Sequence, residues 1–461
     1  MENLGEALYK SVTDINYGLA KWIEPYIYHI LAVYVSLPIL AYFLLPFIFS
    51  DGSHYGTKSV TIFVLGDIGH SPRMCNHAKS FANLEYNVNL CGYNESTIPD
   101  ELMDSERIDI YAIKVFKRRR FPYIVYVILK ATFQCFEIFK LLSSFRGTDY
   151  IMIQNPPSLP VLAISVFFIK VFSRKTKLII DWHNMNYSIL NMKYNDETHV
   201  LVRFLKGYEK IFSRFADINL TVTEKMKSFL IEKFEIDKSK VLVFYDRPGD
   251  NFAPLDKIEF TKDEILSHEA FNGTDASNRK IVITSTSFTP DEDFNILLDG
   301  LKAYEQDSTT EPVLVLVTGK GPLKTQFLRR VKQLAFSDKI KIKSVWLSYE
   351  DYPIIMAVAD IGISLHTSSS GMDLPMKILD FYGCGVPAIS LNYPAISELV
   401  HEGVNGYITD TNDATELSRL LKKTFQNKGG YEKIKENAIK ESQQRWKQNW
   451  NDKLGEIFNY R

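Results

Sequence analysis

The sequence predicts an α/β protein with two Rossmann-like domains that face each other across a cleft, preceded by one transmembrane helix. Short apolar strands alternate with helical patterns through most of the chain, which is typical of parallel α/β sheets. A Pro/Gly-bearing break, RPGDNFAPLD, interrupts this alternation at Arg247–Asp256. The longest apolar run precedes the first strand, at residues 25–49. At 461 residues, the chain can form two or three domains with large cores.

Composition excludes several classes of protein. The net charge is −1, so no overall basic field points to nucleic acid as a partner. The cysteines are scattered, without a Cys-x-x-Cys motif or a Cys/His cluster; they are Cys75, Cys91, Cys135 and Cys384. This pattern argues against a disulfide framework and a structural zinc site, and it fits a reducing compartment.

The apolar run at residues 25–49 is long enough to cross a bilayer, because a helix of this length rises about 37 Å. A signal peptide fits poorly, since a tail of residues 1–24 precedes the run and no Ala-x-Ala-like site follows it. A buried core helix is the alternative. The scattered cysteines fit a reducing compartment and so favour a cytosolic body. This would place residues 1–24 on the lumenal side of the membrane.

The first domain is expected at residues 59–246. Its first strand runs into a glycine turn in which Gly66 and Gly69 bracket Asp67, and a helical pattern follows. A strand, a GxxG turn and a helix open a Rossmann-like unit, although the pattern is too short for a dinucleotide fingerprint.

Two very apolar helical runs in this domain, at residues 121–142 and 159–172, are interrupted by charged residues. We interpret them as surface-docked or core helices rather than further membrane spans. The basic cluster Lys117–Arg120 before the first run suits contact with an anionic membrane surface. A solvated charge run beside a core helix explains it equally well.

The strand that begins at Lys177 carries three polar residues at its C-terminal end: Asp181, His183 and Asn184. Ligands bind at this end of the strands in open parallel sheets. A hydrogen-bonded loop histidine and a functional histidine are equally consistent with this position.

A linker with a polar surface insertion is expected at residues 247–278, and the second domain at 279–428. In that domain the first strand ends in a Ser/Thr turn, and the acidic run at residues 291–293 reads as a helix start. The final segment, residues 429–461, is expected to form a C-terminal helix on which Trp446 and Trp450, four apart, share one face.

The stretch from Gly362 to Val400 contains a strand, a Ser/Gly turn and a helix that opens near Pro375. Small residues in such a turn let backbone amides approach an anion at a helix N-terminus. Lys377 and Asp380 lie three apart on one helix face, which would place a cation near phosphates and a carboxylate near a ribose. An ordinary strand–turn–helix with a solvated salt bridge is the alternative.

The segment PMKILDFYGCGVP, residues 375–387, resembles the Pro-x-Lys-x-x-Glu-Tyr…Gly-x-Pro region of GT-B glycosyltransferases. Further stretches resemble the chitobiosyldiphosphodolichol β-mannosyltransferase family of the endoplasmic reticulum; they are GDIGHSPRM (66–74), QNPPS (154–158), DWHN (181–184), YSIL (187–190), STSFTPDEDF (285–294) and SGMDLPMK (370–377). The resemblance covers residues 59 to about 425, and the N-terminal apolar run also matches the family's layout.

The resemblance implies transfer of mannose from GDP-mannose to dolichol-linked chitobiose, with a β-1,4 bond and inversion at the anomeric carbon. It implies a single-pass protein of the endoplasmic reticulum membrane with a cytosolic catalytic body, GDP-mannose as substrate rather than a permanent cofactor, no metal, and other dolichol-pathway mannosyltransferases as possible partners. The first domain would bind the acceptor and dock on the membrane, and the second would bind the nucleotide sugar.

An inverting transfer needs a base for the acceptor hydroxyl and stabilisation of the departing nucleotide. Asp67 is the first choice for the base and His183 the second. The remaining site residues are expected to bind substrate; they are Gly66, Gly69, His70, Arg73, Asn184, Ser287, Gly319, Lys320, Ser370, Gly371, Asp373, Lys377 and Asp380.

Two departures from related enzymes bear on these roles. Relatives often carry a basic pair after the first strand of the second domain, whereas the region around Ser287 has none, so Lys320 and Lys377 are the candidates to hold the diphosphate. Relatives also often carry two glutamates eight apart, whereas Asp373 lies seven before Asp380, which leaves its role open. A retaining GT-B enzyme with another acceptor and a catalytically silent GT-B subunit remain as alternatives.

Overall fold

The computed structural model describes residues 57–116, 122–290 and 292–459. The predicted transmembrane segment at 25–49 and the basic cluster Lys117–Arg120 lie outside these residues. Among the helices that the structure describes, none combines the length and the apolar character needed to cross a membrane.

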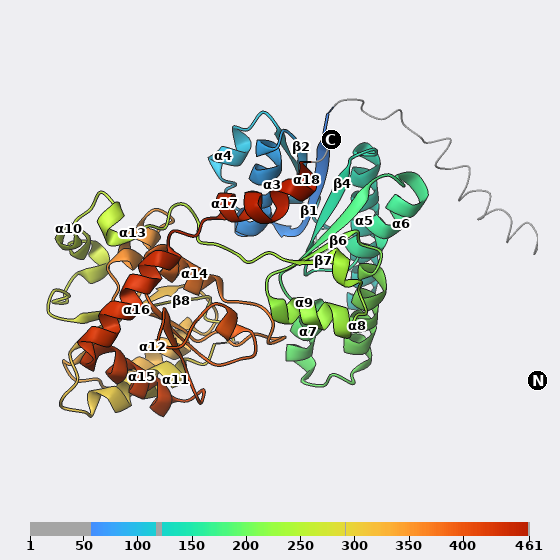
Figure 1. Cartoon of the computed structure of the whole chain (residues 1–461). Helices are drawn as coiled ribbons and strands as arrows, with labels where there is room; N and C mark the ends of the chain where they lie inside the picture. The colour runs from blue at the N-terminus through green and yellow to red at the C-terminus, as the bar shows by residue number, and fades with distance from the viewer. Residues whose placement is uncertain (1–56, 117–121, 291, 460–461) are drawn as a thin grey trace, which may run out of the picture.

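The fold consists of two parallel sheets, each covered by helices (Figure 1), which confirms the predicted α/β architecture. The seven-stranded sheet of the N-terminal half has the order β3-β2-β1-β4-β5-β6-β7. Its strands are β1 (Ser59–Asp67), β2 (Asn87–Tyr93), β3 (Ile108–Ala112), β4 (Tyr150–Asn155), β5 (Lys177–Trp182), β6 (Ile218–Thr221) and β7 (Val241–Val243). Its helices are α3 (Pro72–Asn83), α4 (Asp100–Met103), α5 (Tyr123–Ser144), α6 (Val161–Phe172), α7 (Asn186–Tyr194), α8 (Val200–Ser213) and α9 (Glu224–Glu232).

The six-stranded sheet of the C-terminal half has the order β10-β9-β8-β11-β12-β13. Its strands are β8 (Lys280–Thr286), β9 (Val313–Gly319), β10 (Ile340–Val345), β11 (Ile361–Ser364), β12 (Ala388–Ser390) and β13 (Gly406–Ile408). Its helices are α10 (Lys262–Leu266), α11 (Phe294–Glu305), α12 (Lys324–Leu334), α13 (Asp351–Ala357), α14 (Met376–Gly383), α15 (Ala414–Gln426) and α16 (Lys428–Glu441). Central strands of the two sheets, such as β1 and β9, are near-continuous apolar runs, because helices bury both of their faces.

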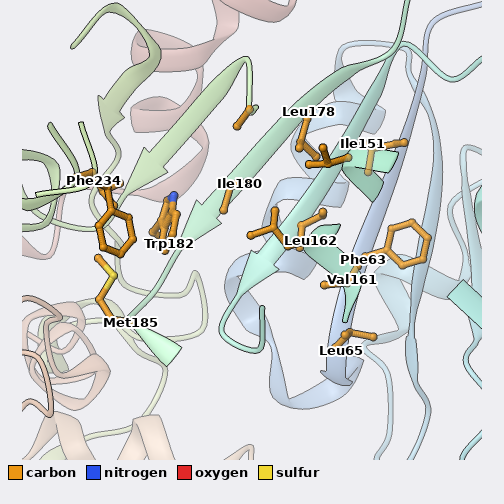
Figure 2. Close-up of a cluster of buried hydrophobic side chains, with 14 of the residues drawn as sticks. Phe63, Leu65, Ile151, Val161, Leu162, Leu178, Ile180, Trp182, Met185 and Phe234 are labelled. Carbon is orange, nitrogen blue, oxygen red and sulfur yellow. The ribbon is translucent and has the colours of Figure 1, made fainter. Parts of the chain in front are cut away.

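The core of the N-terminal half lies on both faces of its sheet. On one face, side chains of β4 and β5 pack against α5, α6 and α8, with Trp182 fully buried near Phe234 (Figure 2). On the other face, α3 packs against β1 and β2 through Phe81 and neighbouring apolar residues. The two apolar runs predicted as docked or core helices form α5 and α6 on the first of these faces.

The linker segment is more buried than predicted. Most of its polar residues are exposed, but several of its apolar residues lie in the core of the C-terminal half; they are Phe252, Ile265 of α10, Ala270, Phe271 and Ala276. The prediction of a surface insertion is therefore wrong for these side chains, because scattered apolar positions within a polar sequence give no periodic signal of burial.

The C-terminal segment does not form one helix. It consists of α16, then α17 (Trp446–Trp450), a π-helical turn (Asn451–Gly455) and α18 (Glu456–Phe458). Figure 1 shows α16 on the C-terminal half and α17 and α18 beside α3 of the N-terminal half. The chain must break between α16 and α17 because the two helices pack on different halves, and Arg445 fixes the crossing by donating to the carbonyls of Gly249 and Phe252, both at 2.8 Å.

Candidate active site

The candidate site lies where the carboxyl ends of the two sheets meet, and hydrogen bonds join the halves there. The Asn184 side chain, two residues after β5, donates to Asp373 Oδ1 at 3.0 Å and to Ser369 Oγ at 3.2 Å. The Thr223 hydroxyl donates to the Met372 carbonyl at 2.6 Å. The structure thus brings Asn184 together with the Ser/Gly turn that begins after β11.

His183 lies beside a buried ionic network. Its Nε2 is 2.8 Å from Asp181 Oδ2, and the same carboxylate receives both forks of the Arg73 guanidinium at 2.8 Å. Burial opposes the charge on Asp181, but Arg73 and His183 hold the pKa of that carboxyl well below its usual range. An ionised Asp181 favours the tautomer that carries its proton on Nε2, which leaves Nδ1 of His183 as the ring atom able to accept a proton.

Arg73 has little surface left for a ligand. Its side chain is 3% exposed, and it also donates to Asp246 Oδ1 at 2.8 Å. Its guanidinium carbon lies 5.1 Å from the centre of the Phe244 ring and 5.6 Å from that of Trp446. Predicted as a substrate ligand, Arg73 is placed instead to orient Asp181.

Asp67 at the end of β1 lies beside a histidine, as Asp181 does at the end of β5, but the Asp67 carboxylate already accepts several hydrogen bonds. Oδ1 accepts from the amides of Glu95 and Ser96, and Oδ2 accepts from the Ser96 hydroxyl. Nδ1 of His70 lies 2.7 Å from the same Oδ2. Desolvation opposes ionisation, but these hydrogen bonds lower the pKa of Asp67 below its ordinary value. A carboxylate with these three donors and an adjacent imidazole is a poor proton acceptor, whereas the imidazole of His70 is 79% exposed.

Asp373, whose role the sequence left open, links three side chains of the site. It accepts from Asn184 of the opposite half, from the Ser368 hydroxyl, and from His366 Nε2 at 3.1 Å. Ser370 lies 3.5 Å from the same carboxylate, and its hydroxyl accepts from the Met372 amide at 3.2 Å. Gly371 adopts a φ of +71°, so the turn needs a residue without a β-carbon there.

Lys377 lies in the first turn of α14 and forms an ion pair with Glu292. Glu292 is 3% exposed in its side chain, and the Thr286 hydroxyl at the end of β8 also donates to it. The acidic run was predicted to be only a helix start. That prediction holds for Asp293, whose side chain caps α11, but not for Glu292, which points to the site.

Asp380 is the predicted ribose ligand, one turn further along α14. Burial raises the pKa of Asp380 to about 7, with the Tyr352 hydroxyl 3.4 Å from its Oδ2. A carboxyl in this environment gains strongly from hydroxyl donors that compensate its ionised form.

The ends of β8 and β9 approach each other closely beside these residues. Gly319 has a φ of +146°, and a β-carbon there would lie 1.8 Å from the Thr286 carbonyl oxygen, so the approach requires glycine. Ser287 and Lys320 are exposed at this edge, and the Lys320 ammonium lies 3.7 Å from the centre of the Trp346 ring. Of the two candidate cations, Lys377 is therefore near Asp380 on one helix, whereas Lys320 rests on an aromatic surface.

A buried glutamate holds the residues that follow the His183–Asn184 turn. Glu209 of α8 accepts from Asn155 Nδ2 at 2.9 Å and from the amides of Asn186 and Tyr187 at the start of α7. Burial raises the pKa of Glu209 to about 7. No local pattern marks Glu209, Glu292, His366 or Tyr352, which is why the sequence did not identify them.

Within residues 57–116, 122–290 and 292–459, no group of three or more His, Cys, Asp or Glu side chains is arranged to hold a metal ion. The arrangement offers instead a histidine on an ionised carboxylate, a lysine at a helix N-terminus and a carboxyl beside it, divided between two halves. Such a set suits a transfer in which a proton and a nucleoside diphosphate leave in opposite directions.

Comparison with known proteins identifies the family. The model of glycosyl transferases group 1 matches residues 268–441. A Debaryomyces hansenii protein named chitobiosyldiphosphodolichol beta-mannosyltransferase is 54% identical, covering 95% of this chain and 96% of its own length. A Homo sapiens protein of the same name is 36% identical, covering 85% of this chain and 91% of its own. The chain belongs to the chitobiosyldiphosphodolichol β-mannosyltransferase family.

Solved structures place this β-mannosyltransferase family member among GT-B folds. A glycosyltransferase from Rickettsia africae superposes with a TM-score of 0.62 over 88% of the chain at 17% identity, and WaaG, a glycosyltransferase involved in lipopolysaccharide biosynthesis, with 0.61 over 87% at 11%. At this identity, the likeness supports the fold alone. The group 1 match spans the half of the β-mannosyltransferase that carries Glu292, His366, Lys377 and Asp380.

Proposed function

We propose that the protein transfers mannose from GDP-mannose to the terminal GlcNAc of GlcNAc2-diphosphodolichol, forming a β-1,4 bond with inversion. The observation that carries this proposal is the 54% identity, over 95% of the chain, with a protein named for this activity. We further propose that it works at the endoplasmic reticulum membrane with its body in the cytosol, since the acceptor's name implies a membrane lipid.

We propose His183 as the base. The acceptor hydroxyl would lose its proton to Nδ1 while its oxygen forms the bond to the anomeric carbon, and Asp181 would stabilise the resulting imidazolium. The contact between Asn184 and Asp373 supports this choice, because it places His183 next to the turn of the donor half. Asp67, with its acceptor positions filled, would instead hold the His70 turn in place for the acceptor sugar.

The donor half would bind GDP-mannose along α14. Asp380 would accept hydrogen bonds from the ribose, while Lys377 and the backbone of residues 367–371 would compensate the diphosphate as the anomeric C–O bond breaks and GDP departs with the electron pair. Glu292 supports this role, because its ion pair holds the Lys377 ammonium at the start of the helix.

The reaction is tested with detergent-purified full-length protein, GDP-mannose and phytanyl-linked chitobiose. Mass spectrometry should show the addition of one hexose, and a β-mannosidase should remove it. A product resistant to β-mannosidase and cleaved by an α-mannosidase would favour the retaining alternative, and absence of transfer would favour a silent subunit.

A further inference from the structure

A basic pocket lies at the edge of the N-terminal sheet that faces away from the candidate active site. It is a cavity of about 350 Å³ between the end of α6, the start of β5 and the segment after α8. Four of its lining residues are basic and one is acidic; they are Lys170, Arg174, Lys175, Lys177 and Asp217. One oxygen of Asp217 already accepts from the Leu178 amide at 2.8 Å. Because the four cations outnumber this one carboxylate, the pocket favours an anion.

The rest of the pocket is apolar. Val166, Ile169, Leu178 and Phe215 line it, and Phe215 is 46% exposed at the surface. The ammonium of Lys170 lies 5.8 Å from the centre of the Phe215 ring. Cations around an apolar wall match a ligand with an anionic head and an apolar body rather than a free inorganic ion.

The position of the pocket relates it to the N-terminal segment. Val60, Tyr150 and Lys177 form one row across β1, β4 and β5, so the chain enters the sheet at the same edge as the pocket. The apolar run predicted to span the membrane ends at residue 49, and the residues between it and β1 reach at most about 30 Å when extended. This edge therefore stays within reach of the bilayer if that segment crosses it.

The neighbouring surface has matching chemistry. Phe167 of α6 and Ile211 of α8 are more than half exposed, three and four positions from the pocket residues Lys170 and Phe215. The exposed charged residues of α5 and α6 are all basic, since their one acid, Glu137, is buried. Basic side chains beside exposed apolar ones are typical of surfaces that contact anionic lipid.

We propose that this pocket binds the phosphate head group of an anionic phospholipid and thereby holds the N-terminal edge of the first sheet against the membrane. The phosphate would lie among the cations, and the adjoining acyl chains would lie along Phe215 and the exposed side chains of α6 and α8. The proposal rests on the membrane location given above, and it goes beyond it by naming the surface and the ligand class.

Native mass spectrometry of the detergent-purified full-length protein tests the pocket directly. Dioctanoyl-phosphatidylserine should bind with one preferred site, while dioctanoyl-phosphatidylcholine and inorganic phosphate should bind at least tenfold more weakly. Equal binding of phosphatidylcholine would overturn the requirement for an anionic head group. Inorganic phosphate binding as tightly as phosphatidylserine would show a phosphate site without lipid specificity, which also overturns the proposal.

Removing one positive charge of the pocket and reversing another identifies the site. The double variant Arg174→Gln, Lys175→Glu should lower phosphatidylserine affinity at least tenfold, whereas Lys332→Glu, an exposed reversal on α12 of the other half, should leave it unchanged. Unaltered binding by the double variant would overturn the assignment. Mannosyl transfer to the phytanyl-linked acceptor in detergent is measured on the same samples. Because neither variant touches the site of the reaction, this activity reports the fold and the proposed function independently of phospholipid binding.

Discussion

At the scale of single residues, the candidate site depends on how each ionisable group is partnered. Asp67 and Asp181 both lie at the C-terminal end of a strand of the first sheet, and both contact a histidine. Asp67 accepts hydrogen bonds from Glu95 and Ser96 in the segment after β2, whereas Asp181 is held by a buried arginine and leaves its histidine beside the opposite half. Their environments, rather than their residue type, assign them different roles.

Replacing His183 by Ala is expected to lower kcat by about 10²–10⁴, the usual contribution of a general base, with GDP-mannose affinity nearly unchanged. Asp67→Asn should cost less, because the amide can keep part of the same hydrogen bonding. Steady-state turnover and a separate donor-binding titration on both variants check this. A nearly active His183→Ala with an inactive Asp67→Asn would return the base role to Asp67.

Replacing Lys377 by Ala should weaken donor binding about 10–100-fold, since a hydrogen bond to a charged group contributes about 1.5–3 kcal/mol. Lys320→Ala, which removes an exposed ammonium over Trp346, serves as the matched comparison and should have a smaller effect. Isothermal titration with GDP-mannose measures both. A larger loss at Lys320 would reverse the assignment of the diphosphate ligand.

Asp380 should make donor binding depend on pH. Its pKa is raised to about 7, so the free protein carries a protonated carboxyl below pH 7, and the ionised form that accepts two ribose hydroxyl bonds is lost as pH falls. Affinity for GDP-mannose should therefore fall by up to tenfold per pH unit below 7 and level off above it. The ligand is GDP-mannose rather than GDP, because the terminal phosphate of GDP titrates near pH 6 and would add a pH dependence of its own.

Asp380→Asn is the control for this pH dependence. The variant should bind GDP-mannose more weakly at pH 8 and show little change between pH 6 and pH 8. A slope that persists in Asp380→Asn would assign the titration to another group.

At the scale of elements, the C-terminal helices complete the layer over α3. Trp450 is fully buried, its Nε1 donates to His77 Nδ1 at 3.1 Å, and its ring lies 5.4 Å from that of Phe81. Trp446 donates to the Ser80 hydroxyl at 3.0 Å. The last helices of the chain are thus part of the core of its first half.

Trp450→Ala should destabilise the protein by about 3–5 kcal/mol, the range for removing a buried aromatic side chain. Trp346→Ala, at an exposed position, should change stability by no more than about 0.5 kcal/mol. Thermal unfolding of the detergent-purified proteins, followed by tryptophan fluorescence and circular dichroism, compares the two. Equal melting temperatures would mean that α17 is not needed for the fold of the first half.

At the scale of the whole molecule, Glu398 helps to set how the halves meet. Its carboxylate accepts from the amides of Glu224 and Lys225 at the N-terminus of α9, at 2.7 and 2.9 Å, and from the Tyr245 hydroxyl at 2.8 Å. An anion at a helix N-terminus is favourable, and here it comes from the other half.

Glu398→Ala should lower kcat several-fold with GDP-mannose affinity unchanged. The donor binds to one half of the molecule, whereas transfer needs both halves in the correct relative position. Glu402→Ala, an exposed carboxylate in the same loop, is the matched control. Donor titration and turnover separate the two effects. A parallel loss of donor affinity would show that Glu398 acts within the donor half instead.

The sequence predicted the architecture well and the site in part, for physical reasons. Buried parallel strands are local apolar runs, so both sheets and the strand end at Asp181–Asn184 were visible in it. Contacts between residues far apart were not: Glu292 meets Lys377 across 85 positions, and Asn184 meets Asp373 across 189. The break before Trp446 was missed likewise, because helical periodicity does not show that the two ends of a segment pack on different halves.

The return of the chain to its first half has a consequence for its synthesis. Phe81 of α3 packs against Trp450 and Phe458, and the Tyr86 hydroxyl donates to the Phe458 carbonyl at 2.7 Å. These partners are among the last residues to leave the ribosome. At about 5–20 residues per second, the interval between the completion of β7 and the arrival of α17 is roughly 10–40 s. During that time the nascent first half exposes an aromatic surface that the finished protein buries, which makes this interval the one in which we expect it to be most prone to aggregation.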